Sequence, residues 1–457
     1  MAAVGAGTVL GSSAGHPDLL PVSRRGRRHG GGTRRPPNLI VIFADDMRKD
    51  EARYMPSLQR LIAAKGTTFE AARHNIALCS PARAGFLTGQ YSKRHQVRGQ
   101  GDAFHQHNDT KKTLAVWLHS AGYRTGIIGK YFTSREGGTS PPGWDIRRQL
   151  ATRIQEQYGY GVWDGNELRK PERDQTRYLQ REVLAFLDDA TEPFFLWFTP
   201  TAGHTPFQAP PTHERDGRVT WPDLREDDVS DKPPWIQLLS PITDDVLLGI
   251  RNGERKRIQE LLGLDDTIAA TIERLEASHR LANTVVVFTS DNGILWGEHR
   301  IPPGSKNLPY EPAVRVPCIA RGPGFPHTTI HQPVHMSMDL TATCVELAGA
   351  TPDLPLDGVS LSRIIGDPSS YDDRQLLYDR DAREAFTFPP PSGMVPPPAD
   401  GVFTRNRKLI RYKSEPTIYE LYDLDADPEE LSNVADHPDY LNDRSELEGA
   451  LDGLLAS

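Results

Sequence analysis

The stretch NLIVIFADDM, residues 38–47, places a short apolar run directly before two aspartates. A run of this length, rich in Ile, Val and Phe, is typical of a strand buried on both faces of a parallel sheet. Asp45 and Asp46 cannot both stay desolvated without a counter-charge, so the strand delivers ionised groups to one edge of the sheet. The pattern predicts an α/β fold with a polar site at that edge.

Three more apolar runs end in polar or charged residues. They are YRTGIIGKYF (123–132), EPFFLWFTPTAGHTPF (192–207) and NTVVVFTSDNG (283–293), with the candidate site residues Lys130, His204, Asp291 and Asn292. In open α/β sheets, ligands bind beyond the carboxyl ends of the parallel strands. We therefore expect these side chains to meet the two aspartates in one crevice.

Helical periodicity separates these runs. Apolar residues recur at helical spacing in TLAVWLHSAGY (113–123), where Thr113 is placed to cap the helix, and in RIQELLGLDDTIAATIERL (257–275). In DLTATCVELAG (339–349), the same spacing puts Cys344 on an apolar face and predicts that it is buried. The alternation of strands and helices supports the α/β prediction.

Composition narrows the class of protein. The chain has 457 residues, of which 37% are hydrophobic and 25% charged, as in a globular protein larger than one usual domain. The formal charge of −8 and the dispersed Lys and Arg residues argue against nucleic acid as a partner. No apolar run reaches the ~18 residues of a membrane-spanning helix, so we expect no transmembrane segment. The spacing of Cys79, Cys318 and Cys344 argues against a disulfide framework or a Cys-rich zinc site.

The N-terminal residues differ from the rest of the chain. MAAVGAGTVLGSSAG (1–15) resembles the apolar and cleavage regions of an export signal, without a preceding basic residue, and SRRGRRHGGGTRRPPN (23–38) is typical of a basic linker. We expect residues 1–36 to be a disordered basic tail or a truncated export signal. A truncated signal would place the protein outside the cell or in its envelope, and otherwise we expect it in the cytoplasm.

The composition changes again near residue 365. The Pro-rich stretch FPPPSGMVPPPAD (388–400) precedes two strand-like runs, RKLIRY (407–412) and IYELYDL (418–424), and then acidic, helix-like residues. We expect a first domain over residues 37–365 and a smaller C-terminal α+β subdomain over residues 366–457.

The strand-end residues suit a metal ion. Asp45, Asp46, Asp291 and Asn292 offer only oxygen donors, which favour Ca²⁺, with Mg²⁺ as the alternative. Taken alone, Asp-Asn-Gly is also a turn sequence and Asp-Asp a helix cap. Their shared position at strand ends favours the metal site.

One further stretch carries a family resemblance. Residues 79–83, CSPAR, match the C-x-P-x-R pattern and are followed by AGFLTGQYSKRHQV (84–97), so the chain resembles the type I, formylglycine-dependent sulfatases from about residue 37 onward. The resemblance implies an alkaline-phosphatase-like large mixed sheet between helices, with residues 37–365 as the sulfatase catalytic domain. For Cys79 alone, the alternative is an inert cysteine before a helix-starting proline.

The resemblance also implies a role for each site residue. Cys79 would be oxidised by a formylglycine-generating enzyme to Cα-formylglycine, whose hydrate attacks the sulfur of a sulfate ester. FADD and SDNG imply Asp45, Asp46, Asp291 and Asn292 as metal ligands together with modified Cys79. Arg83 would hold the hydrate and Lys130 would bind near it. His204 of GHTPF and Lys306 of PGSKNLPYE would grip sulfate oxygens, one of them assisting the leaving oxygen.

The sequence also resembles one branch of the family. REDDVSDKPPWIQ (225–237), GKYF (129–132) and PPGWD (141–145) are similar to the glucosamine-6-sulfatase-like branch, which implies a sulfated carbohydrate such as 6-sulfated N-acetylglucosamine as substrate, with an aryl sulfate as surrogate. Two positions depart from the pattern, because Phe132 stands where many relatives have histidine and Thr133 where this branch often has asparagine. His299 of WGEHR has no assigned role.

Other functions remain open at this level. A broad arylsulfatase and a phosphate or phosphonate ester hydrolase of the same superfamily share the geometry and the metal need. A non-catalytic protein that binds sulfated glycans would keep the same pocket. A zinc protease is poorly supported because the sequence contains no H-E-x-x-H.

Overall fold

The computed structural model describes residues 35–132, 139–213, 219, 225–380 and 396–456. Residues 36–457 form one compact unit. The prediction for residues 1–36 concerns a segment that lies, apart from its last two residues, outside the described part. Within the described residues, no helix combines the length and apolarity needed to cross a membrane.

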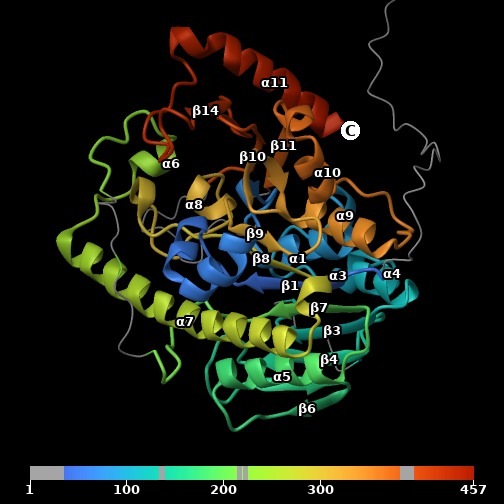
Figure 1. Cartoon of the computed structure of the whole chain (residues 1–457). Helices are drawn as coiled ribbons and strands as arrows, with labels where there is room; N and C mark the ends of the chain where they lie inside the picture. Colours follow the sequence, from blue (N-terminus) through green and yellow to red (C-terminus); the bar gives the residue numbers. More distant parts are fainter. Residues whose placement is uncertain (1–34, 133–138, 214–218, 220–224, 381–395, 457) are drawn as a thin grey trace, which may run out of the picture. The chain divides into compact units, whose positions relative to one another are not determined.

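A ten-stranded mixed sheet forms the centre of the unit (Figure 1). Its spatial order is β10-β2-β9-β8-β1-β7-β3-β4-β5-β6. The strands are β1 (Asn38–Ala44), β2 (Thr67–Arg73), β3 (Arg124–Gly129), β4 (Ile146–Thr152), β5 (Gly161–Asp164), β6 (Glu167–Arg169), β7 (Phe194–Thr199), β8 (Thr284–Ser290), β9 (Cys318–Arg321) and β10 (Thr328–His335). The four runs predicted from the sequence are β1, β3, β7 and β8, which are neighbours and all parallel. The predicted α/β class is confirmed.

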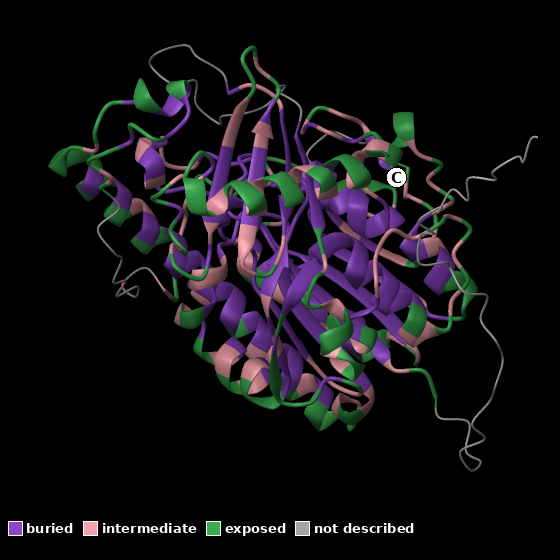
Figure 2. Cartoon of the chain, turned by 90° about the horizontal axis from the view of Figure 1, so that it is seen from above, coloured by how far each residue is buried: buried purple, intermediate pink, exposed green. Residues whose placement is uncertain are grey.

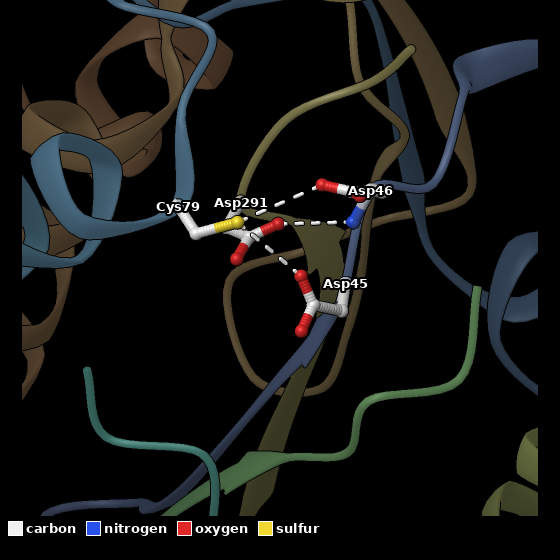
Figure 3. A group of neighbouring side chains, drawn as sticks. All are labelled: Asp45, Asp46, Cys79 and Asp291. Carbon is white, nitrogen blue, oxygen red and sulfur yellow. Dashed lines mark hydrogen bonds between the residues drawn. The ribbon is translucent and has the colours of Figure 1, made fainter. Parts of the chain in front are cut away.

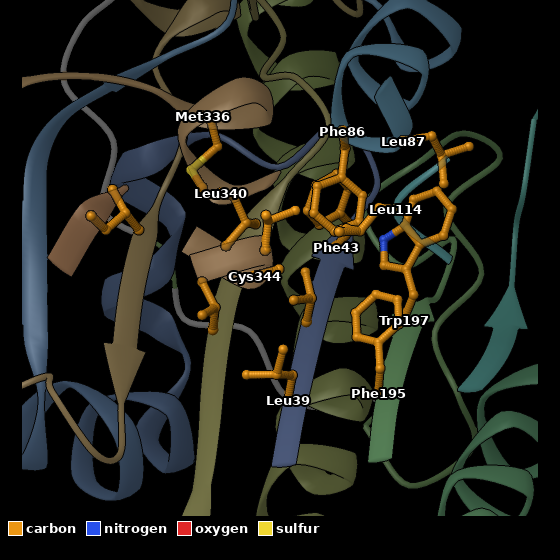
Figure 4. Packing of buried hydrophobic residues seen from close by; sticks show 14 of the residues in the cluster. Leu39, Phe43, Phe86, Leu87, Leu114, Phe195, Trp197, Met336, Leu340 and Cys344 are labelled. Carbon is orange, nitrogen blue, oxygen red and sulfur yellow. The ribbon is translucent and has the colours of Figure 1, made fainter. Parts of the chain in front are cut away.

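Both faces of these strands are buried, which explains their unbroken apolar sequences. In β1, Leu39, Val41 and Phe43 pack on one side of the sheet, against α1, α4 and α9 (Figure 4), while Ile40 and Ile42 pack on the other, against α5 and α7. Figure 2 shows the buried residues concentrated in the sheet and the exposed ones on the outer sides of helices and loops. The helices therefore form a layer on each face of the sheet.

The helices largely follow the predicted pattern. They are α1 (Cys79–Thr88), α2 (Ser92–His95), α3 (Phe104–His107), α4 (Leu114–Ser120), α5 (Gln175–Asp189), α6 (Pro234–Gln237), α7 (Asp244–Ala277), α8 (Glu311–Val314), α9 (Met336–Ala348), α10 (Leu361–Gly366) and α11 (Leu441–Ala456), with shorter turns η1 (Lys49–Tyr54), η2 (Leu58–Ile62), η3 (Ala63–Lys65), η4 (Leu281–Asn283), η5 (Glu298–Arg300), η6 (Pro368–Tyr371) and η8 (Pro438–Tyr440). Cys344 is buried on α9, as predicted. Thr113 is the N-cap residue of α4, but its side chain accepts no capping hydrogen bond. The helix predicted over 257–275 begins earlier, after Thr243, whose hydroxyl accepts from the Val246 amide.

A second, four-stranded antiparallel sheet follows in the chain. It consists of β11 (Leu376–Arg380), β12 (Ala399–Phe403), β13 (Arg407–Tyr412) and β14 (Ile418–Asp423). One face packs on α11 through Leu447 and Leu451, and the other packs on Tyr310 and Trp235. The strands predicted over 407–412 and 418–424 are therefore present as β13 and β14. The domain boundary near residue 365 stays a prediction.

A buried ion network joins the two sheets. Arg73 of β2 binds both carboxylate oxygens of Glu311, at 2.8 and 2.9 Å. Lys408 of β13 lies 2.8 Å from the same carboxylate and 2.5 Å from that of Glu430. All four residues are buried, so each charge depends on the others for compensation. The network ties the small sheet to the strand that precedes Cys79.

Candidate active site

The predicted site residues lie at one edge of the large sheet. Asp45 and Asp46 follow β1, Asp291 follows β8, and Cys79 begins α1 after the loop that leaves β2 (Figure 3). β9 is antiparallel to both β2 and β8, so these two strands end at the same edge. One potential ligand atom from each of these residues lies within 4.8 Å of those of the others. Topology therefore brings together residues up to 246 positions apart in the sequence.

Each carboxylate of this cluster has a cationic partner. The Lys130 ammonium lies 2.6 Å from Asp45 Oδ2. The Lys306 ammonium lies 2.7 Å from Asp46 Oδ1 and 3.4 Å from Cys79 Sγ. These contacts place two buried ammonium groups beside the cysteine.

The third carboxylate is held by an arginine. Arg83 donates to Asp291 Oδ2 from Nε and from its terminal nitrogen, at 3.0 and 2.7 Å. It also donates to the Lys130 carbonyl at 2.6 Å. Since Arg83 follows Cys79 by one turn of α1, the guanidinium fixes this helix against two strand ends at once.

The cations decide the ionisation of the cluster. Burial by itself raises the pKa of Asp45, but Lys130, His204 and Arg83 hold that pKa well below its usual value. Burial likewise opposes ionisation of Asp46, whose pKa is lowered by Lys306. Burial and the neighbouring Asp45 instead raise the pKa of Asp291. Asp45 and Asp46 therefore remain carboxylates, the form that binds a hard cation.

The residues present fit a divalent metal ion. Asn292 donates from its side-chain amide to Asp46 Oδ1 at 2.6 Å, which brings this residue into the cluster. Its side-chain oxygen is buried and accepts no hydrogen bond from any described residue. A buried amide oxygen without a donor, next to ionised carboxylates, is a hard ligand available to a cation such as Ca²⁺.

His204 lies at the open side of the cluster. Its Nε2 is 3.6 Å from Asp46 Oδ2, and its Nδ1 is 2.7 Å from the Thr205 carbonyl. The side chain is 16% exposed, whereas those of Asp45 and Lys130 are fully buried. Burial lowers the pKa of His204 and outweighs the attraction of Asp46. His204 is thus placed to meet a ligand that enters from solvent.

A residue that the sequence reasoning missed connects two site loops. Arg257 of α7 is buried and donates to the carbonyls of Asp46 and Gly203, one residue before His204. Its charge is balanced by Glu51, whose carboxylate oxygens lie 2.5 and 2.8 Å from Nε and a terminal nitrogen. The helical periodicity of residues 257–275 predicted a helix but gave no signal for this role.

The loop that carries His204 is further fixed by Glu260. This carboxylate accepts from the amides of Gly203 and Gln208, at 3.2 and 2.5 Å. Burial raises the pKa of Glu260 to about 8. Gly203 has φ +102°, and a Cβ there would lie 2.4 Å from the Asp45 carbonyl oxygen, so only glycine allows this close approach.

Three other positions singled out in the sequence lie apart from the cluster or outside the described residues. His299 binds Glu226 at 2.8 Å and packs against the Tyr310 ring, and it is not part of the cluster formed by Asp45, Asp46, Cys79 and Asp291. Phe132 is buried and stacks on Phe104, with ring centroids 5.1 Å apart. The position where many relatives have histidine therefore offers an anion no hydrogen bond. Thr133 lies outside the described residues.

Comparison with known families gives two matches. A family described as "Sulfatase" matches residues 37–350. A second, described as "N-sulphoglucosamine sulphohydrolase, C-terminal", matches residues 297–456. Together they cover the two sheets and all the candidate site residues.

Individual proteins are also similar to the chain. N-acetylglucosamine-6-sulfatase of Homo sapiens is 27% identical over 455 residues, which cover 88% of this chain and 82% of the relative. An arylsulfatase of Volvox carteri is 27% identical over 92% of this chain and 74% of its own. A structure solved in complex with its substrate D-glucosamine-2-N,6-O-disulfate aligns with a TM-score of 0.74 at 21% identity, over 92% of this chain and 97% of the other. That likeness establishes the shared alkaline-phosphatase-like fold.

The contact between Arg257 and Glu51 allows a direct test of how the site loops are held. Arg257→Met removes the ion-pair partner of the buried Glu51, which among the described residues keeps only its hydrogen bond from the Arg48 amide, so we expect the free energy of unfolding to fall by about 3 kcal/mol. The double variant Arg257→Met/Glu51→Gln removes that charge and should regain most of the stability, as measured by denaturant unfolding.

A measurement of metal binding distinguishes a role of Arg257 in positioning the site from a role in stability alone. We expect both variants to bind Ca²⁺ more weakly by about tenfold or more in isothermal titration calorimetry, as for lost supporting contacts of metal sites. The reason is that the Asp46 and Gly203 carbonyls lose their common donor in both. If the double variant binds Ca²⁺ as tightly as the wild type, Arg257 does not position the site.

Proposed function

The chain belongs to the sulfatase family and is a sulfuric ester hydrolase, and we propose that it cleaves sulfate esters of a sugar with a Cα-formylglycine made from Cys79 and a bound Ca²⁺ ion. The observation that carries this proposal is the meeting of Cys79 with Asp45, Asp46 and Asp291 within 4.8 Å at the catalytic edge of the sheet. A buried inert cysteine has no need of three carboxylates and two ammonium groups around it.

The proposed modification explains why a cysteine lies here. Converted by a formylglycine-generating enzyme, the residue would supply a nucleophilic hydroxyl for attack on sulfur and a second hydroxyl whose proton loss permits elimination of sulfate. Position 79 is the first residue of α1, so a developing negative charge there also faces the positive end of a helix.

Asp45, Asp46, Asp291 and Asn292 are the proposed metal ligands, together with modified residue 79. Ca²⁺ is favoured because all the protein donors are oxygens, and Mg²⁺ is the alternative. Such an ion would supply positive charge next to the ester oxygens.

The chain's own cations would bind the sulfate group. Lys306 reaches both Asp46 and Cys79, so its ammonium lies where sulfate oxygens approach the nucleophile. Lys130 and Arg83 hold the carboxylates and orient α1. His204 is the partly exposed member, and with Lys306 it would contact the sulfate oxygens, one of the two assisting the leaving oxygen.

The similar proteins support a sulfated amino sugar as the substrate. One relative is named N-acetylglucosamine-6-sulfatase, and one structural neighbour holds a glucosamine disulfate. Another relative is named arylsulfatase, so a broad arylsulfatase is the second candidate. Phe132 favours neither of these two candidates. Its stacked aromatic ring offers the sulfate group no hydrogen bond, and this affects the anion rather than the sugar.

The proposed nucleophile can be tested at position 79. Peptide mass spectrometry of the protein produced together with a formylglycine-generating enzyme should find formylglycine at position 79. Cys79→Ala should lower the turnover of an aryl sulfate by about 10⁴-fold or more, as for loss of a nucleophile elsewhere, while circular dichroism stays unchanged. Near-normal turnover by purified Cys79→Ala would refute the mechanism.

The proposed metal site can be tested at Asp291. Asp291→Ala removes a proposed ligand and the partner of Arg83, so elemental analysis should find the bound Ca²⁺ lost. The matched control Asp266→Ala removes a half-exposed carboxylate that pairs with His213 and should keep the metal. Full Ca²⁺ occupancy in Asp291→Ala, or zinc in its place, would contradict the assignment.

The third prediction concerns the sugar. We expect kcat/KM for 6-sulfated N-acetylglucosamine to exceed that for its 3-sulfated isomer by about 100-fold or more, since a pocket that hydrogen-bonds a sugar discriminates by position. A galactose sulfate and an aryl sulfate complete the comparison. If the aryl ester is the better substrate and the two isomers react alike, the enzyme is a broad arylsulfatase.

A further inference from the structure

Two neighbouring pockets lie along α5, apart from the catalytic cluster. Their volumes are about 460 and 430 Å³, and both are lined by Arg173 and Arg181. We name their cationic residues the arginine surface: Arg148, Arg169, Lys170, Arg173, Arg177, Arg181 and Arg274. No role in the proposed chemistry involves any of these residues.

The arginine surface is positive on a chain whose formal charge is −8. The first pocket has five cationic residues against three acidic ones, Asp164, Glu172 and Glu182. The second has four arginines against one acidic residue, Asp188. A local excess of this sign attracts anions against the net charge of the protein.

Four of these cations, Lys170, Arg173, Arg177 and Arg181, are available to a ligand. The side chains of Arg177 and Arg181 are 54% and 51% exposed, and their partners Asp174 and Glu182 are near in sequence. Because each of these arginines is about half exposed, a polyanion can contact it from solvent. Lys170 and Arg173 are exposed and have no ion pair with any described residue.

The arrangement suits a linear ligand. Arg177 and Arg181 are four residues apart on α5, which is a step of about 6 Å along the helix, and Arg173 lies two residues before the helix begins. Such a step is comparable with the length of one sugar unit, so successive sulfates of a glycan can meet successive arginines.

The start of α5, next to Arg173 and Arg177, lies at the catalytic edge of the sheet. α5 precedes β7 and so runs from the edge where the parallel strands end to the edge where β7 begins (Figure 1). At its start, Gln175 accepts a hydrogen bond from Thr201, 2.6 Å away, in the loop that carries His204. Arg173 and Arg177 flank this contact in the sequence.

We propose that the arginine surface is a binding site for the sulfated chain of a polymeric glycan substrate, separate from the pocket that cleaves the ester. It would hold sulfates that are not being hydrolysed while another reaches residue 79. The inference rests on the proposed function only in taking a sulfated glycan as the substrate.

The test measures binding rather than turnover. The probe is a heparin decasaccharide, titrated by isothermal calorimetry over a range of NaCl concentrations. The triple variant Arg173→Gln/Arg177→Gln/Arg181→Gln is compared with Arg251→Gln/Arg255→Gln/Arg363→Gln, which removes the same charge from exposed arginines elsewhere. Circular dichroism and thermal unfolding verify that both variants fold.

We expect the first variant to bind the decasaccharide at least about tenfold more weakly, with a slope of log affinity against log salt reduced by about one per lost arginine. The control variant should match the wild type in both. Equal weakening in the two variants, or none in either, would overturn the site.

Two further measurements identify the ligand and separate this proposal from the proposed function. If a DNA duplex of equal charge binds as tightly and depends on the same arginines, the surface is a general polyanion site and the glycan assignment is wrong. Turnover of an aryl sulfate by the wild-type protein tests the proposed function. A failure there leaves the decasaccharide result unaffected, so the two proposals fail separately.

Discussion

Three carboxylates buried at the edge of a sheet impose the constraint on which the rest of this structure depends. An ionised group without a partner cannot remain in the interior, and Asp45, Asp46 and Asp291 are each matched by a cation from a different part of the chain. Lys130 follows β3, Arg83 belongs to α1, and the loop after β8 supplies Lys306. The site can form only when these elements are in place, so folding and assembly of the cluster are one process.

The sequence predicts much of this assembly for a simple geometric reason. Apolar runs without alternation indicate strands buried on both faces, and parallel strands end at one edge, so the residues after β1, β3, β7 and β8 had to meet. Periodicity alone could not place Cys79, because a loop separates β2 from α1 and the direction of β2 depends on the antiparallel β9 between it and β8. Only the family resemblance connected this cysteine with the aspartates.

The sequence did not predict the buried residues that hold the site loops in place. Arg257 and Glu51 are 206 residues apart, and neither lies in a motif. An amphipathic pattern identifies the buried face of α7 by its apolar residues, so an arginine on that face is read as an irregularity rather than as a structural group. The start of α7 was missed because a polar run, RNGERKR (251–257), separates the apolar residues of its first turns from the periodic stretch that follows. Buried polar partners become visible only when both ends of a long-range contact are known.

The segment 225–237, on which the resemblance to the glucosamine-6-sulfatase-like branch partly rests, makes well-defined contacts in the structure. Trp235 and Ile236 are buried among residues of the small sheet, and the Lys232 ammonium donates to the Glu430 carbonyl at 2.6 Å. These contacts account for residues 232–236 through packing of the C-terminal sheet, and a role of the segment in sugar recognition stays a prediction. A long glycan also differs from a simple ester in the groups that extend beyond the cleaved residue. The proposed arginine surface, which lies near the contact between Gln175 and Thr201 of the His204 loop, would bind such groups by charge and so affect the binding of long substrates while the bond-breaking groups stay the same.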